Sequence, residues 1–168
     1  SIMIGFAILM YGMNFMSAAV KPLADMPEFT SILTAFTNPL LGIFTGLLLT
    51  AVIQSSSASV GILQALALTG SISYGMAIPI IMGQNIGTCV TALISSIGVN
   101  KSAKRVAVIH IAFNIIGTTV CMVLFYIAHY FFDFAFIDSP IAPVGIAIVH
   151  SIFDIFTTVI LLPISTVF

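Results

Sequence analysis

The chain has 168 residues, of which 60% are hydrophobic and only 5% are charged, and its mean hydropathy is +1.26. Soluble domains carry about 25% charged residues, so this composition excludes an ordinary soluble fold and predicts an all-α integral membrane protein. The formal net charge of −1 and the lack of a long basic tract exclude a nucleic-acid partner.

The first predicted element is a membrane span at residues 2–20, which carry no charge. A helix needs about 20 apolar residues to cross a bilayer. The chain opens without an initiator Met, a basic segment or a cleavage motif, so we expect a piece of a longer protein and no signal peptide. Apolar residues at helical spacing after Pro27 predict a short interfacial helix at 26–37.

Residues 39–69 are largely apolar around the motif QSSS at 54–57, which leaves an arm of about 15 residues on either side. Each arm is shorter than the roughly 20 residues that a span requires, so we expect a re-entrant hairpin with QSSS at its tip. Unpaired polar groups in hydrocarbon cost several kcal/mol. The QSSS side chains must therefore be paired. They could form hydrogen bonds with neighbouring helices, but four consecutive polar residues at a hairpin tip favour a binding site.

A second interrupted segment is predicted at 74–97, where Pro79, Gly83 and Gly87 bracket Gln84 and Asn85. Proline and glycine at membrane depth are typical of a broken helix. A break leaves free carbonyls at the end of the first half and free N–H groups at the start of the second half. The carbonyl end carries about half a negative charge and the N–H end about half a positive charge. The carbonyl end suits a cation such as sodium, and the N–H end suits an anion.

Two further spans are predicted at 106–128 and 141–162. The basic loop before them, from Lys101 to Arg105, is expected to be cytoplasmic because positive charges favour that side of a membrane. The two spans share a weak internal repeat, HIAFNIIGTTV at 110–120 and HSIFDIFTTVI at 150–160.

Each repeat places a histidine one helical turn before a second polar residue, His110 before Asn114 and His150 before Asp154. For the histidines we favour structural hydrogen bonds within the bundle. A carboxylate within a span costs about 2.5 to 3.5 kcal/mol, so Asp154 is expected to face a cavity as a cation ligand or a proton site.

No Lys or Arg lies in either predicted break, so an anion there would depend on neutral donors, helix dipoles and bound cations. Dependence of anion binding on a cation is the physical basis of coupled transport. We also weigh a structural membrane subunit, a transporter of another small anion, and an intramembrane serine hydrolase. The hydrolase is disfavoured because the chain has no GxSxG motif, so we predict that it is not an enzyme.

The segments QSSSAS, GQNIGTCVTALISSIG and HIAFNIIGT, in this order, resemble the type II sodium-dependent phosphate cotransporter family, especially its bacterial members. The resemblance runs from Gly12 to Pro163 and implies a fold of two inverted repeats that transports sodium and phosphate by alternating access. This chain has one QSSS, so residues 1–168 resemble a single repeat unit, the second half. A second QSSS-containing repeat, from the same chain or another copy, is then implied.

The resemblance also implies a multi-pass protein of the cell membrane, in a bacterium the inner membrane, with Na+ as coupling ion and no organic cofactor. The residues expected to bind phosphate are Gln54, Ser55, Ser56, Ser57 and Thr88. Those expected to bind sodium are Gln54, Ser55, Asn85 and Thr88, followed by Asn114 and Asp154.

Overall fold

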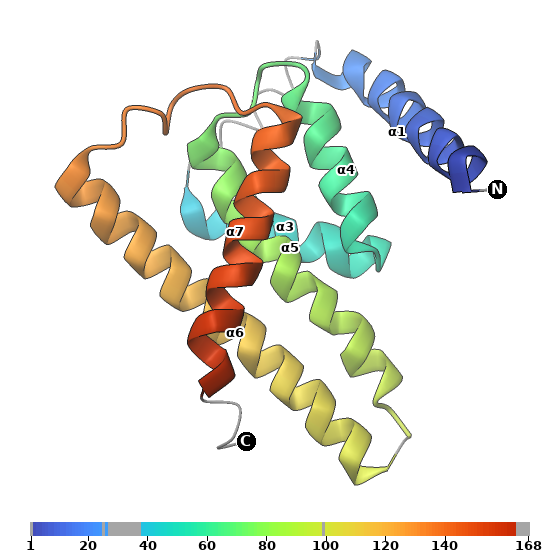
Figure 1. Cartoon of the computed structure of the whole chain (residues 1–168), viewed down its shortest axis with the longest axis vertical. Coiled ribbons are helices and arrows are strands. Elements are labelled where there is room, and N and C mark those ends of the chain that lie inside the picture. Colours follow the sequence, from blue (N-terminus) through green and yellow to red (C-terminus); the bar gives the residue numbers. More distant parts are fainter. Residues whose placement is uncertain (1, 25, 27–37, 99, 164–168) are drawn as a thin grey trace.

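The computed structural model describes residues 2–24, 26, 38–98 and 100–163 (Figure 1). Within these ranges the chain forms helices and no β-strand, which confirms the all-α prediction. The helices are α1 (Ile2–Ala24), α3 (Pro39–Ile53), α4 (Ser56–Ala67), α5 (Tyr74–Ser95), α6 (Lys101–Phe132) and α7 (Pro143–Leu161). Apart from Met26, the interfacial helix predicted at 26–37 lies outside the described residues.

Among the described residues, α5, α6 and α7 are long and apolar enough to cross a membrane. The chain is therefore a membrane protein. The first predicted span falls within α1, which lies to one side of the other helices and contacts α4 (Figure 1). That α1 crosses the membrane remains a prediction.

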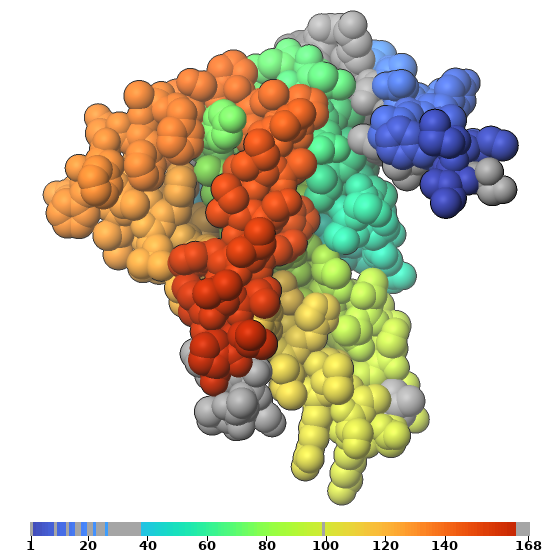
Figure 2. All heavy atoms as spheres, in the orientation of Figure 1, coloured from blue at the N-terminus to red at the C-terminus, as the bar shows by residue number. Residues whose placement is uncertain are grey.

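Helix α6 is longer than the span predicted at 106–128, because it starts at Lys101. The side chain of Asn100 caps it by accepting a hydrogen bond of 3.0 Å from the N–H of Ala103. The basic loop predicted from Lys101 to Arg105 is therefore wrong as a loop, since these residues form the first turns of α6. Side chains at this end of α6 project beyond the rest of the molecule (Figure 2). The cytoplasmic location of this end of the helix remains a prediction.

The helix break predicted at QSSS is present. Helix α3 ends at Ile53 and α4 begins at Ser56. Gln54 adopts a left-handed conformation with φ of 56°, and its N–H donates to the Thr50 carbonyl at 2.7 Å. Ser55 caps α4 by accepting from the N–H of Ala58 at 3.3 Å. Entry of both arms from one side of the membrane remains a prediction.

The break predicted within 74–97 is wrong, because α5 is continuous from Tyr74 to Ser95. Pro79 lies in the second turn, where its missing N–H leaves one carbonyl of the helix without its usual donor. The predicted helix-end charges at 83–88 are consequently absent. Any ion bound at this level depends on side chains instead.

The glycines of α5 serve a different purpose, which is close packing against α3. A Cβ atom on Gly83 would collide with the backbone carbonyl of Ile43, and one on Gly46 with that of Ile80. At Gly87 a Cβ would lie 2.6 Å from the Leu47 oxygen. Small residues on both helices let the two backbones approach closely, so α3 and α5 form one tightly packed pair.

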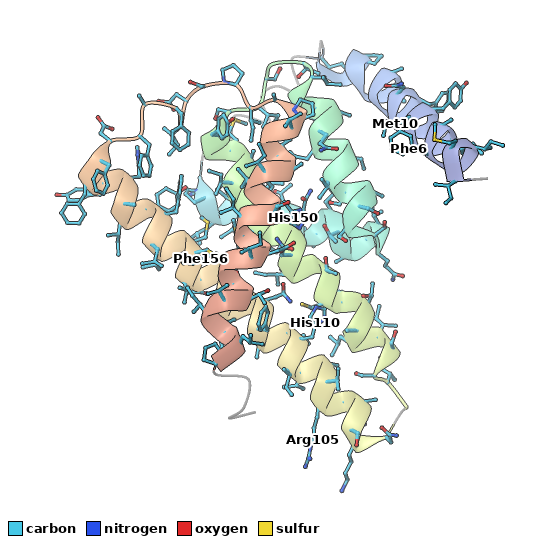
Figure 3. The ribbon with its side chains drawn as sticks, viewed as in Figure 1. Phe6, Met10, Arg105, His110, His150 and Phe156 are labelled. Carbon is cyan, nitrogen blue, oxygen red and sulfur yellow. The ribbon has the colours of Figure 1, made fainter. Side chains whose placement is uncertain are left out.

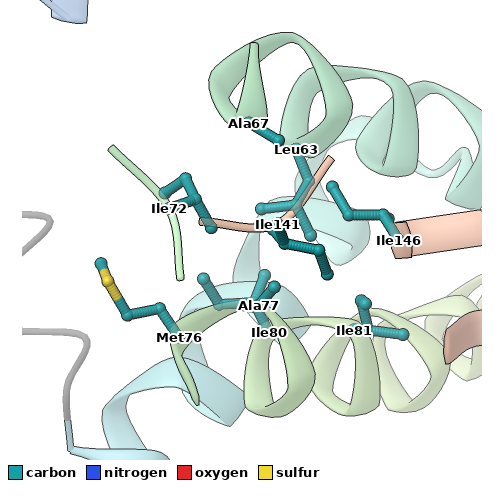
Figure 4. Close-up of a cluster of buried hydrophobic side chains, with 9 residues drawn as sticks. All are labelled: Leu63, Ala67, Ile72, Met76, Ala77, Ile80, Ile81, Ile141 and Ile146. Atoms are coloured by element: carbon teal, nitrogen blue, oxygen red, sulfur yellow. The ribbon is translucent and has the colours of Figure 1, made fainter. Parts of the chain in front are cut away.

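The far end of α4 is held by a hydrophobic cluster (Figure 4). Its buried members come from α4, α5, the start of α7 and the two connections beside them: Leu63, Ala67, Ile72, Met76, Ala77, Ile80, Ile81, Ile141 and Ile146. The two connections are joined by backbone hydrogen bonds, including Ile141 N–H to the Ile72 carbonyl at 2.9 Å. This cluster fixes the position of α4 against α5 and α7.

Candidate functional site

A polar pocket of about 320 Å³ lies where the start of α4 meets α5, α6 and α7. It is lined by Ser56, Asn85, Thr88, His110, Phe113, Asn114, His150, Phe153, Asp154, Thr157 and Thr158. Each of the three long helices contributes polar residues three or four positions apart, which share one helix face. The pocket therefore gathers side chains from segments that are far apart in the sequence.

Five of the residues predicted from the sequence line this pocket: Ser56, Asn85, Thr88, Asn114 and Asp154. The other three, Gln54, Ser55 and Ser57, lie beside it on the QSSS tip and do not line it. Gln54 and Ser57 are exposed. The Ser55 hydroxyl is engaged in capping α4 and lies 3.2 Å from that of Ser57. Of the four QSSS residues, Ser56 alone lines the pocket.

The amides of the pocket turn their nitrogens toward their own helices. Asn85 Nδ2 donates to the Ile81 carbonyl at 3.2 Å, and Asn114 Nδ2 donates to the His110 carbonyl at 3.0 Å. The Thr88 hydroxyl likewise donates to the Gln84 carbonyl at 3.0 Å. After these bonds each amide keeps its oxygen and one further N–H, and the Thr88 hydroxyl keeps its lone pairs. The oxygens among these groups suit hard cations.

The charged group of the pocket is Asp154, whose Oδ2 lies 3.5 Å from Nε2 of His150. Its side chain is 58% exposed, whereas that of His150 is 21% exposed. Neither Lys nor Arg is among the residues that line the described pocket. Across the same described residues, no three His, Cys, Asp or Glu side chains group as a metal site.

The sequence reasoning missed two features of the site. The histidines, interpreted as structural, both line the pocket from α6 and α7 (Figure 3). Their repeated spacing before Asn114 and Asp154 was the signal that pointed to a shared location. The second feature is Gln84, which is fully buried and has no hydrogen-bond partner for Nε2 or Oε1 among the described residues. Its isolation depends on the packing of α3 and could not be seen in the sequence.

A separate pocket of about 300 Å³ lies between α5, α6 and α7 and differs in character. Its walls are almost entirely apolar, with Phe125, Phe153 and Phe156 among them. It offers no oxygen cluster to an ion. The polar pocket is therefore the better candidate for the functional site.

The model of the Na+/Pi-cotransporter family matches residues 8–159. The chain belongs to this family. The resemblance noted in the sequence is thereby confirmed, and the Na+/Pi-cotransporter family is a family of transporters. No solved structure shows a significant match to the chain.

Individual relatives differ in how much of them the chain covers. Uncharacterized protein YqeW of Bacillus subtilis is 28% identical over 166 residues, which is 98% of this chain and 53% of that protein. Sodium-dependent phosphate transport protein 2A of rat is 35% identical over 116 residues, 66% of the chain and 18% of that protein. Putative inorganic phosphate export protein YjbB of Escherichia coli is 25% identical over 120 residues, which is 71% of this chain and 22% of that protein. The chain thus spans about half of the first relative and about a fifth of the others.

Proposed function

We propose that this chain is one repeat of a transporter that couples the movement of inorganic phosphate to that of sodium by alternating access. The observation that carries the proposal is the polar pocket, in which the QSSS tip meets oxygen-rich faces of α5, α6 and α7. It lies within a chain of the Na+/Pi-cotransporter family. Sodium and phosphate are both cargo, and no organic cofactor is required.

The cation side of the proposed site consists of side-chain oxygens. Asn85, Thr88 and Asn114 each direct one donor to their own helix and keep their oxygens available, and Asp154 supplies a negative charge. Gln84 precedes Asn85 and does not line the pocket, but its buried amide lacks a hydrogen bond among the described residues, which is costly unless a ligand engages it. We therefore propose its oxygen as a further sodium ligand. Gln54 and Ser55 add oxygens at the carbonyl end of α3.

The anion side is the beginning of α4. The first N–H groups of a helix lack partners within the helix and favour negative charge. Ser56 lies at this position and lines the pocket, and Ser57 follows it. A cation held by the neighbouring oxygens would offset the charge of phosphate, so that each ion favours binding of the other.

A second QSSS-containing repeat, from the same polypeptide or another copy, would complete the site. The support is that Gln54 and Ser57 are exposed beside the pocket. A partner repeat that covers this face would bring them into contact with the bound ions. The chain also spans only 53% of its Bacillus relative.

Uptake of labelled phosphate into liposomes that contain the full-length protein tests this proposal. We expect uptake with an inward sodium gradient and little with potassium. Ser56→Ala is expected to reduce uptake at least about tenfold, because a hydrogen bond to a charged group contributes about 1.5–3 kcal/mol. The control is Ser71→Ala, at an exposed position in the α4–α5 connection, which should transport normally. Equal uptake in potassium, or full activity of Ser56→Ala, would refute the proposal.

A further inference from the structure

We propose that His110 and His150 hold the anion in the polar pocket, each through a ring N–H. This inference rests on the proposed function for the identity of the anion as phosphate. The two imidazoles reach the same pocket from different helices, His110 from α6 and His150 from α7 (Figure 3).

The first argument is the supply of hydrogen-bond donors. The amides of Asn85 and Asn114 and the hydroxyl of Thr88 already donate to backbone carbonyls of their own helices. An anion needs donors, and one donor of each of these three side chains is already used. Of the other polar groups that line the pocket, the imidazoles of His110 and His150 and the hydroxyls of Ser56 and Thr158 donate to no backbone carbonyl among the described residues. The imidazoles reach the pocket from two helices and so can contact an anion from two sides.

The pocket also lacks the cationic side chains that commonly hold an anion. It is lined by no Lys or Arg within the described part of the chain. An anion in this pocket must therefore be held by hydrogen-bond donors, and each imidazole supplies a ring N–H.

Contacts of two kinds hold His150 and His110 at the pocket wall. Nε2 of His150 lies 3.5 Å from Oδ2 of Asp154, and this contact orients the ring. The backbone carbonyl of His110 accepts from Asn114 Nδ2 at 3.0 Å and from Cys89 Sγ at 3.7 Å. Both residues are therefore positioned at the pocket wall before a ligand arrives.

Binding of radiolabelled phosphate to the purified full-length protein in saturating sodium tests the inference. We expect His110→Ala and His150→Ala each to raise the dissociation constant for phosphate at least tenfold. The affinity for sodium in the absence of phosphate should change less than twofold. His110→Gln and His150→Gln retain an N–H donor and should recover part of the loss.

His129→Ala is the matched control. His129 lies on α6 near its end, its ring stacks on Phe134 at a centroid distance of 5.9 Å, and it does not line the pocket. Phosphate affinity should be unchanged in this variant. Unchanged affinity in both alanine variants at His110 and His150, parallel loss of sodium and phosphate affinity, or equal losses in the Ala and Gln variants would overturn the inference. Phosphate binding that requires the histidines in a protein without transport would support it and refute the proposed transport function.

Discussion

Replacing Gly83 by Ala is expected to lower the stability of the protein strongly by separating α3 from α5. The added Cβ would meet the backbone carbonyl of Ile43, which cannot move aside as a side chain can. Overpacking of a core typically costs about 1–3 kcal/mol, and we expect a value at or above the upper end of this range. Thermal unfolding in detergent micelles measures the effect.

Gly12→Ala provides the control, since no heavy atom lies within 4 Å of the Cβ that it would add. Gly12 is inside α1, where Ala favours the helix by about 0.5–1 kcal/mol. This variant should be as stable as the native protein or slightly more so. A Gly83→Ala protein with a native melting temperature would contradict the proposed role of glycine in the α3–α5 contact.

Replacing Gln84 by Met is expected to give a protein that is more stable without sodium and no longer stabilised by it. Leaving a buried polar group unsatisfied costs about 1–3 kcal/mol, and Gln84 is fully buried with neither amide atom paired among the described residues. Met has a similar shape and removes this cost. It also removes the oxygen that we propose as a sodium ligand.

The measurement is the melting temperature in sodium and in potassium at equal ionic strength. A ligand that binds only the folded state raises the free energy of unfolding, by an amount that grows with the logarithm of its concentration above the dissociation constant, so the native protein should melt higher in sodium. Gln64→Met is the matched control, because Nε2 of Gln64 donates to the Pro143 carbonyl at 3.1 Å. That variant should lose stability and keep the sodium effect. A full sodium effect in Gln84→Met would exclude Gln84 from the cation site.

The helix break at QSSS was predictable because its signal is local. Two arms too short to span a membrane, separated by QSSS, required a break in the helix between them. The structure places that break at Gln54 and Ser55. Helix α6 was also predictable in its apolar part, whereas its start at Lys101 depended on the cap from Asn100.

The continuity of α5 could not be predicted, because Gly83 and Gly87 have two physical uses. Glycine permits a break in a helix, and it also permits close contact with a neighbouring helix. The choice depends on whether a second backbone lies against the glycines. In this chain α3 does so, through Ile43 and Leu47, and this contact is a property of the tertiary structure.

The histidines show a similar limit. Their spacing from Asn114 and Asp154 indicated that each pair shares a helix face, but spacing within one helix does not reveal what that face meets. The structure brings both faces to a pocket that also contains Ser56. The polar residues of four helices acquire a common role only through this arrangement.

Under the proposed function, sodium and phosphate bind one coupled site. This coupling can be measured as the phosphate dissociation constant of the purified full-length protein, in sodium and in potassium at equal ionic strength. We predict at least about tenfold tighter binding in sodium, which corresponds to a coupling free energy of about 1.4 kcal/mol or more. Equal phosphate affinity in the two salts would contradict the account.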